Sequence, residues 1–268
     1  MFFQNQENIK KLIDVSKAAG HAIMDIYNTN FEVQSKKDET PITKADLISN
    51  KIICESLGKI NPNIPILSEE SSNISYSERS KWNDYWLVDP LDGTKEFIKK
   101  NDEFTTNIAL IRNNAPVFGI IHIPATNQTY WGSVTGGSYY LEGDTYSERV
   151  KISVSHSQSN LRIVCSRSHP TGELEELLAK LDNYELVRTG SSIKFCLIAN
   201  GNADCYPRLG PTSEWDTAAG EIIARSAGAN IVSFDDKPLK YNLRNSYLNP
   251  HFLVSNSLQT KQKILEKI

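Results

Sequence analysis

A short apolar run that ends in acidic residues constrains this chain more than any other feature. Residues 85–88 read Tyr-Trp-Leu-Val and are followed directly by the sequence DPLDGT at 89–94. A continuous apolar run of this length, bounded by turn residues, is typical of a strand that is buried on both faces. Such a strand needs layers of structure on both sides, and the aspartates at its end are then held near the core.

The spacing of apolar residues predicts the other elements. Apolar residues recur every three or four positions from about Asn8 to Tyr27 and again after Thr43, which indicates two amphipathic helices. Glycines near 136 and 143 indicate turns of an antiparallel meander. We expect strands at 66–68, 107–111, 117–123, 129–133, 161–165 and 184–187, and helices that begin at Thr94 and span about 171–181 and 192–200.

The pattern changes near residue 155, where strands and helices begin to alternate as in an α/β unit. We therefore predict an N-terminal α+β lobe at residues 1–154 and a C-terminal α/β lobe at residues 155–268. No Pro-, Ser- or Gly-rich linker separates them, so the two lobes are expected to pack tightly. A chain of 268 residues is long enough for one large domain or for two such lobes.

Composition and charge narrow the class of protein. The net charge of −3 gives no general attraction to a nucleic acid polymer, so a polyanionic ligand must be held by local cations or metals. The chain has no signal-like start and no apolar stretch near the ~20 residues that span a bilayer. Its four cysteines form no CxxC pair and are expected to be buried reduced thiols. We expect a cytoplasmic protein; homodimer formation and peripheral attachment to the inner face of the cell membrane stay open.

Three acidic clusters lie at the ends of predicted elements. Glu69 and Glu70 follow a strand, Asp89 and Asp92 follow the apolar run, and Asp216 begins a helix. Functional side chains gather at such places in α/β proteins. Each cluster alone has a simpler explanation, namely a solvated charge run, a turn or a helix N-cap. Their joint occurrence favours one shared site.

The DPLDGT sequence offers a coherent set of ligands. Pro90 stiffens a turn that can bring the two carboxylates together, and the carbonyl of Leu91 can face the same point. Gly93 allows the backbone to approach a ligand closely, and Thr94 supplies a hydroxyl at a helix start, where a phosphate is favoured. Carboxylates with a carbonyl make a hard oxygen site, which suits Mg²⁺ better than zinc.

These clusters, in this order, resemble the inositol monophosphatase-like superfamily of Mg²⁺-dependent, lithium-sensitive phosphatases. The family pattern is an EE pair after a strand, then DPxDGT, then WDxAAG; this chain has EE at 69–70, DPLDGT at 89–94 and WDTAAG at 215–220. The match spans nearly the whole chain. It implies an α/β (mixed α+β) class and a layered αβαβα sugar-phosphatase-like fold with two tightly packed lobes.

Further segments resemble one branch of that superfamily, the bacterial 3′(2′),5′-bisphosphate nucleotidases of sulfur assimilation. Inositol monophosphatases instead tend to have DGTTNF followed by a histidine. Lys44 departs from the branch, which often has a small residue there, but Asp46 is kept. The resemblance implies hydrolysis of the 3′-phosphate of adenosine 3′,5′-bisphosphate to AMP and phosphate. It rests on DGTKEF at 92–97, NDEFT at 101–105, SRSHP at 166–170, GSSIKFC at 190–196 and YPRLGPT at 206–212.

The resemblance also implies catalytic roles. Thr94 orients an attacking water activated by metal, and Asp46 takes its proton, directly or through the Thr94 hydroxyl. The attack is in line, and no covalent phospho-enzyme is expected. Taken alone, Asp46 is an ordinary acid in the first turn of a helix. Two or three Mg²⁺ ions are expected to be held by Glu69, Asp89, the Leu91 carbonyl, Asp92 and Asp216.

A bisphosphate has a second phosphate, which cations away from the metals should hold. Lys194 and Arg208 are the best candidates, with Ser192 as a hydrogen-bond donor. His169 is a candidate to stack on adenine or to bind a phosphate, although a lone histidine is more often structural. Gly93, Thr94 and Ser166 complete the predicted substrate-binding set.

Three alternative functions make different demands on the sequence. An inositol monophosphatase or related sugar-phosphate phosphatase would have no second phosphate for Lys194 and Arg208 to bind. A metal-dependent phosphometabolite-binding protein without catalysis is disfavoured by the intact Asp46 and Thr94. A Ser or Cys hydrolase is disfavoured because the chain has no GxSxG sequence and no cysteine in an activating motif.

Overall fold

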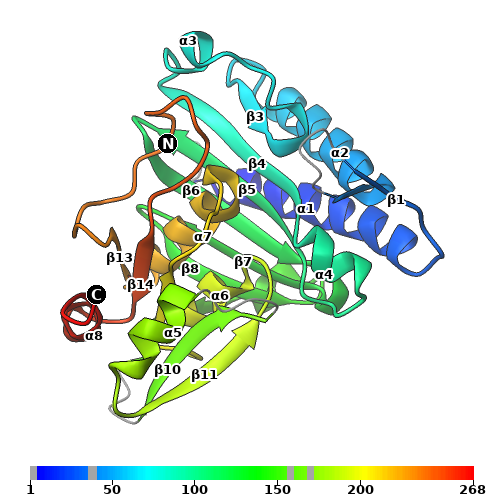
Figure 1. Cartoon of the computed structure of the whole chain (residues 1–268). Helices are drawn as coiled ribbons and strands as arrows, with labels where there is room; N and C mark the ends of the chain where they lie inside the picture. Colours follow the sequence, from blue (N-terminus) through cyan, green and yellow to red (C-terminus); the bar gives the residue numbers. More distant parts are fainter. Residues whose placement is uncertain (1–4, 36–40, 156–159, 168–171) are drawn as a thin grey trace.

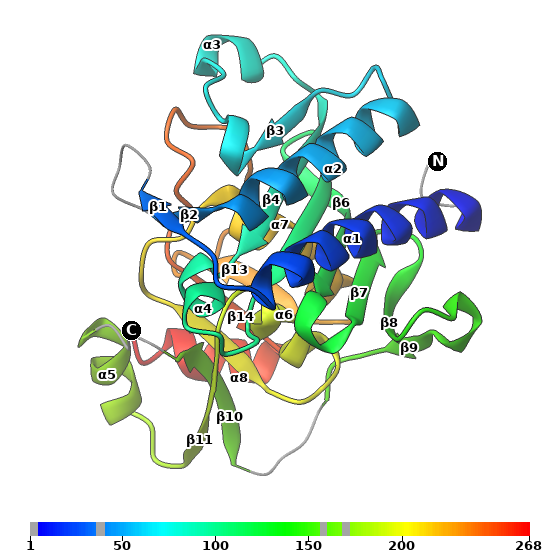
Figure 2. The ribbon, with the colours of Figure 1, turned by 90° about the vertical axis from the view of Figure 1, so that its right-hand side faces the viewer.

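The computed structural model describes residues 5–35, 41–155, 160–167 and 172–268. Its elements stack as five layers: a helical layer, a seven-stranded sheet, a second helical layer, a five-stranded sheet and a third helical layer (Figures 1 and 2). The αβαβα architecture and the mixed α/β class that the sequence predicts are therefore confirmed.

The seven-stranded sheet follows the order of the chain, β3-β4-β5-β6-β7-β8-β9. The β3–β4 pair is parallel, and every later neighbour is antiparallel, which confirms the predicted meander. The strands are β3 (Ile66–Ser68), β4 (Asp84–Asp92), β5 (Thr105–Arg112), β6 (Ala115–Ile123), β7 (Gln128–Ser133), β8 (Gly137–Glu142) and β9 (Val150–Ile152).

The five-stranded sheet has the order β11-β10-β12-β14-β13, with parallel pairs on the β11 side and antiparallel pairs on the β13 side. Each sheet comes from its own side of residue 155. The division into two lobes nevertheless stays a prediction, since a helix from the second part packs on the first sheet. The strands are β10 (Leu161–Ser166), β11 (Tyr184–Thr189), β12 (Cys205–Arg208), β13 (Asn230–Ser233) and β14 (Phe252–Ser255).

Helices cover both outer faces. Helices α1 (Gln6–Tyr27) and α2 (Lys44–Ile60) lie side by side on the seven-stranded sheet (Figure 2), and α5 (Gly172–Ala179) and α8 (Leu258–Leu265) cover the five-stranded sheet. Their apolar faces are buried against the sheets, as their periodicity predicts. The inner helices are α6 (Ile193–Ala199) and α7 (Glu214–Ser226), and the short elements are β1 (Val33–Ser35), β2 (Pro41–Thr43), the 3₁₀ turn η2 (Glu69–Ser71), α3 (Tyr76–Arg79) and α4 (Thr94–Ile98).

Helix α7 approaches the seven-stranded sheet very closely. A Cβ atom on Gly119 of β6 would lie 2.8 Å from Cα of Ala219, and one on Gly132 of β7 would lie 2.8 Å from Cα of Ile223. Any larger residue at either glycine would push the helix away from the sheet. This close packing carries the start of α7, and Asp216 with it, to the end of β4.

The prediction that the strand gives way to a turn after residue 88 is wrong. Strand β4 does not end at residue 88 but continues to Asp92, with a register shift between Asp89, opposite Asn107, and Asp92, opposite Thr105. The shift is a bulge that accepts Pro90, which has no N–H to give to the ladder. Residues three apart in a regular strand point to opposite faces, and the extra residue brings both carboxylates to one side.

The predicted free cysteines are confirmed. Cys165, Cys196 and Cys205 are buried, whereas Cys54 is only half-buried. None of the helices in the described part of the chain has the length and apolar character that a bilayer-spanning segment needs.

Candidate metal and phosphate site

Three carboxylates converge where β4 ends and α7 begins. Oxygen atoms of Asp89, Asp92 and Asp216 all lie within 4.8 Å of one another. Asp89 is buried, and the other two are half-buried. Like charges this close repel one another unless a cation or protons compensate them.

Burial and that repulsion together raise the pKa values of Asp89 and Asp216. Burial, with the charges of Glu69, Asp92 and Asp216, raises the pKa of Asp89 well above its ordinary value. Burial and then the charge of Asp92 raise the pKa of Asp216 from 3.8 to about 7. The ionised cluster is therefore a site that a hard divalent cation would stabilise.

Asp46 and Asp216 hold the same position in two different helices, since each follows its N-cap residue by three. One oxygen of Asp46 accepts the Thr43 N–H and hydroxyl, both at 2.7 Å. One oxygen of Asp216 accepts the Ser213 N–H and the Thr212 hydroxyl, both at 2.8 Å. Helix capping thus fixes each carboxylate and leaves its second oxygen for other partners. The capping explanation and a functional role are compatible.

The Thr94 hydroxyl connects Asp46 with the end of β4. It lies 3.2 Å from Asp46 Oδ1 and 3.4 Å from the Leu91 carbonyl oxygen. Burial raises the pKa of Asp46, although hydrogen bonds from Thr43 and Thr94 oppose the shift. Gly93 has a φ of 91°, so a side chain there would be strained. This geometry lets a carboxylate accept a proton through a hydroxyl.

Glu69 and Leu91 complete the region. Glu69 lies in η2, which packs against β4, and its charge adds to the raised pKa of both Asp89 and Asp216. The Leu91 N–H donates to Asp89 Oδ1 at 3.1 Å. The structure thus brings the predicted metal-ligating residues to one region, and their role as ligands stays a prediction.

Ser192 lies against the acids. Its hydroxyl oxygen is 2.7 Å from Asp92 Oδ2 and 2.8 Å from the Asp216 carbonyl oxygen, and it accepts the Asn107 amide at 2.8 Å. Its hydrogen is therefore directed toward Asp92 or that carbonyl. Sequence reasoning did not identify this link or Asn107. The expectation that Ser192 donates to a substrate phosphate stays a prediction.

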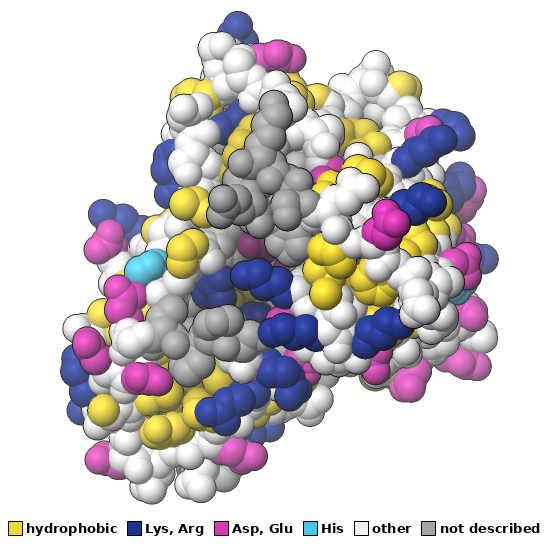
Figure 3. Space-filling view, turned by 45° about the vertical axis from the view of Figure 1, so that its right-hand side comes forward, with side chains coloured by type: hydrophobic (Ala, Val, Ile, Leu, Met, Phe, Trp, Pro, Cys, Tyr) yellow, Lys and Arg dark blue, Asp and Glu magenta, His cyan; other side chains and the backbone are white. Residues whose placement is uncertain are grey.

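A groove leads away from the acids. Lys and Arg side chains gather around the hollow on this face of the molecule (Figure 3). A cavity of about 160 Å³ contains Asp92, Asp216 and the predicted Ser192, Lys194 and Arg208. A neighbouring cavity of about 440 Å³ shares part of that lining. The shared residues are Glu96, Ser166, Tyr206 and Arg208, and the second cavity adds the apolar Leu174, Pro207, Leu209 and Pro211.

The two cations of the groove are held differently. Lys194 is buried, its amine lies 5.7 Å from the centroid of the Tyr206 ring, and burial lowers its pKa from 10.5 to about 8. It forms no ion pair with any residue that the structure describes. The Arg208 guanidinium donates to Ser166 Oγ at 3.3 Å and to the Pro211 carbonyl.

His169 lies outside the described residues, but the segment before it is fixed by Glu103. The Glu103 carboxylate accepts the Arg167 Nε and the Gly190 N–H, both at 2.8 Å. A Cβ on Gly190 would lie 2.9 Å from the carbonyl oxygen of Glu103, so a larger residue there would displace the backbone of that loop. The Glu103 carboxylate therefore ties the ends of β10 and β11 to the loop before β5. Sequence reasoning also missed this residue.

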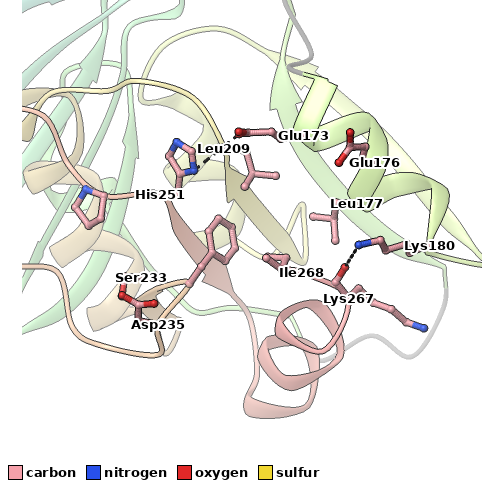
Figure 4. A pocket seen from close by; sticks show the side chains of 12 residues that line it. Glu173, Glu176, Leu177, Lys180, Leu209, Ser233, Asp235, His251, Lys267 and Ile268 are labelled. Atoms are coloured by element: carbon pink, nitrogen blue, oxygen red, sulfur yellow. Dashed lines mark hydrogen bonds and ion pairs between the residues drawn. The ribbon is translucent and has the colours of Figure 1, made fainter.

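Another cavity, of about 470 Å³, lies between α5, the C-terminal residues and the end of β13 (Figure 4). Its lining mixes charges: His251 lies 3.9 Å from the carboxylate of Glu173, and Lys180 donates to the Lys267 carbonyl at 2.9 Å. Its lining contains none of the predicted site residues.

Comparisons with known proteins show which family the chain is similar to. The model of the inositol monophosphatase family matches residues 4–268. The chain is 43% identical over 253 residues to the 3′(2′),5′-bisphosphate nucleotidase CysQ of Escherichia coli strain K12, which covers 92% of this chain and 99% of that protein. It is 43% identical over 263 residues to the protein of the same name from Buchnera aphidicola, with 95% and 97% covered. The crystal structure of CysQ from Bacteroides thetaiotaomicron is similar, with a TM-score of 0.83, 39% identity and 94% and 97% of the two chains covered.

Proposed function

The chain belongs to the inositol monophosphatase family, and from this premise we propose that it is a Mg²⁺-dependent phosphatase that hydrolyses the 3′-phosphate of adenosine 3′,5′-bisphosphate to AMP and phosphate. Relatives named as bisphosphate nucleotidases, 43% identical over most of the chain, support this substrate. The observation that carries the proposal is the joining of an acid cluster to a groove lined by Lys194 and Arg208.

The donor atoms of the cluster fit Mg²⁺. Carboxylates and a backbone carbonyl are the hard oxygen ligands that this ion prefers. When bound, Mg²⁺ supplies positive charge to the phosphate oxygens and acidity to the attacking water. We assign two or three ions to Glu69, Asp89, the Leu91 carbonyl, Asp92 and Asp216.

Asp46 and Thr94 are assigned to the attacking water. The Thr94 hydroxyl orients the water, and Asp46 accepts its proton directly or through that hydroxyl, which lies 3.2 Å away. Burial raises the pKa of Asp46, so it holds a proton better than an exposed carboxylate would. The attack is in line with the departing ester oxygen and requires no covalent intermediate.

The groove is assigned to the rest of the nucleotide. Lys194 and Arg208 bind the phosphate that is not hydrolysed, and the Ser166 hydroxyl supports Arg208. A buried ammonium such as that of Lys194 gains from a phosphate partner, because burial alone disfavours its charge. The apolar side chains of the wider cavity suit a nucleoside.

Phosphate release from a small panel of substrates tests the proposal. The panel contains adenosine 3′,5′-bisphosphate, 3′-phosphoadenylyl sulfate, inositol 1-phosphate and a simple aryl phosphate, each with and without Mg²⁺ and with increasing Li⁺. We expect Mg²⁺-dependent, Li⁺-inhibited release. The kcat/KM for the bisphosphate should exceed that for inositol phosphate by about a hundredfold or more, since each charge-assisted hydrogen bond contributes about 1.5–3 kcal/mol.

Two outcomes would contradict it. Equal kcat/KM for inositol 1-phosphate would favour the inositol monophosphatase alternative. Binding of Mg²⁺ and the bisphosphate without any phosphate release would favour a phosphometabolite-binding protein.

A further inference from the structure

The segment 241–249, here called the strap, crosses between the two acid-bearing segments on which the candidate site depends. On one side, the Tyr247 hydroxyl donates to the Ser72 carbonyl at 2.8 Å. Ser72 immediately follows η2, the single turn that carries Glu69. A turn this short has few hydrogen bonds of its own, so an outside donor at its end helps to fix its orientation.

On the other side, the strap binds the start of α7. The Tyr247 carbonyl accepts the Glu214 N–H at 2.8 Å, and the Tyr247 ring lies 4.9 Å from that of Trp215. The Asn249 amide donates to the Ser213 carbonyl and to Thr217 Oγ1, both at 2.9 Å. Ser213 is the residue whose N–H holds Asp216. Tyr247 therefore contacts the Glu69 segment with its hydroxyl and the Asp216 segment with its ring and its carbonyl.

Arg79 of α3 fixes the path of the strap. It is buried, donates to the carbonyls of Arg244 at 3.0 Å and Asn245 at 2.6 Å, and also bonds the Asn242 side chain. Its guanidinium lies 4.3 Å from the centroid of the Tyr247 ring. The bonds from its two terminal nitrogens to the strap offset the cost of burying the guanidinium, so this residue and the strap define each other's position.

We propose that the strap sets the spacing between Glu69 and Asp216, and that Tyr247 is a positioning residue for the metal-binding acids. This inference rests on the proposed function. Mg²⁺ demands near-ideal octahedral geometry at short distances, so small changes in the spacing of its ligands weaken binding. Residues outside the ligand set that hold ligands in place are known to affect metal affinity.

Two matched substitutions test the inference. Tyr247→Phe removes the hydroxyl that reaches Ser72 but keeps the ring against Arg79 and Trp215. Tyr76→Phe is the control: its hydroxyl donates to the Leu243 carbonyl of the same strap at 2.9 Å, and its ring also faces Arg79, but among the described residues its hydroxyl bonds neither acid-bearing segment. Mg²⁺ binding to EDTA-treated, substrate-free protein is measured by calorimetry and by the Mg²⁺-induced rise in unfolding temperature.

We expect Tyr247→Phe to weaken Mg²⁺ binding by roughly threefold to tenfold, the range that one hydrogen bond can supply. Tyr76→Phe should bind Mg²⁺ as the parent does. The KM for the bisphosphate at saturating Mg²⁺ should be unchanged in both variants. Asn249→Ala, which loosens the strap from α7 and not from η2, should also weaken Mg²⁺ binding and provides a second variant.

The outcomes separate this inference from the function itself. If the parent binds Mg²⁺ and hydrolyses the bisphosphate while Tyr247→Phe and Asn249→Ala bind Mg²⁺ as it does, the strap has no positioning role and the function stands. Equal weakening by Tyr76→Phe would show a general loosening and would also refute the inference. A parent that neither binds Mg²⁺ nor releases phosphate would refute both.

Discussion

The acid cluster and the cation groove are neighbours, but they are built differently. Asp46 and Asp216 each receive hydrogen bonds from their own short segments, Asp46 from Thr43 and Asp216 from Ser213. The cations come from separate elements and have few partners among the described residues: Lys194 of α6 faces the Tyr206 ring, and Arg208 of β12 donates to Ser166 and a carbonyl.

This difference predicts separate roles for the acids and for the cations. The acids are fixed by the backbone before any ligand arrives, so they can supply the same chemistry to any phosphoester. The cations are incompletely paired and gain most from a ligand that brings a second phosphate. We therefore expect changes among the acids to lower turnover for every substrate, and changes in the groove to affect mainly the bisphosphate.

The largest effect should come from Asp92→Asn. It removes a charge from the cluster without changing its size, so the fold should remain and kcat should fall about a thousandfold or more with every phosphoester, because several kcal/mol of charge stabilisation are lost. Steady-state phosphate release measures this, with thermal unfolding as the check of folding. Asp236→Asn, at an exposed carboxylate paired with Lys261, is the control. Turnover equal to that of the parent would remove the metal model.

Arg208→Ala tests the cation groove in place of the acids. We expect KM for the bisphosphate to rise roughly 30- to 100-fold, since a charge-assisted contact contributes about 1.5–3 kcal/mol, while KM for a simple aryl phosphate changes little. The control is Arg188→Ala, an exposed arginine of β11 that lines neither cavity of the groove. Equal increases for both substrates would show that Arg208 does not bind the second phosphate.

The same division explains which parts of the site the sequence predicts. The acids lie in local motifs in which the residue, its cap and the neighbouring apolar run are a few positions apart. Asp46 is held from Thr43 and Asp216 from Ser213, each three residues away. Residues this close in sequence leave a readable pattern, as does the buried strand that carries Asp89.

Contacts between distant segments leave no such pattern. The hydrogen bond of Ser192 to Asp92 spans 100 positions, and that of Tyr247 to Ser72 spans 175. The sequence predicts that Ser192 donates to a substrate phosphate, but its contact with Asp92 cannot be inferred locally, because that neighbour is known only from the fold. The bulge at Pro90 was likewise expected to be a turn, since its pairing partners in β5 cannot be identified locally.

Ser192→Ala tests where the acid cluster ends and the cation groove begins, because Ser192 lines the groove and also bonds Asp92. If its hydroxyl donates to Asp92, kcat should fall by about tenfold for all substrates with KM nearly unchanged, as expected for a lost hydrogen bond to a charged group. Ser191→Ala is the matched control, since that hydroxyl pairs with Thr105 at 2.7 Å and with neither acid. A rise in KM for the bisphosphate alone, at unchanged kcat, would instead place Ser192 on the substrate.

The smallest effect concerns the pH dependence of stability. Burial and the charge of Asp92 raise the pKa of Asp216 from 3.8 to about 7. Between those two values the folded protein keeps a proton that the unfolded chain has released, so this group stabilises the fold most below pH ~4, and that contribution is lost as the pH rises through ~7. Mg²⁺, which needs the ionised carboxylate, should therefore raise the unfolding temperature more at pH 8 than at pH 6.

Asp216→Asn isolates this contribution, because the amide oxygen can still accept the Ser213 N–H but does not titrate. In EDTA, the unfolding temperature of the parent should fall by about 2–4 °C more than that of Asp216→Asn between about pH 6.3 and 8, the shift expected for roughly 1 kcal/mol in a chain of this size. Identical pH slopes for the two proteins would mean that the repulsion is relieved within the metal-free protein. The acids would then resemble the groove in acquiring their final arrangement only when the ligand binds.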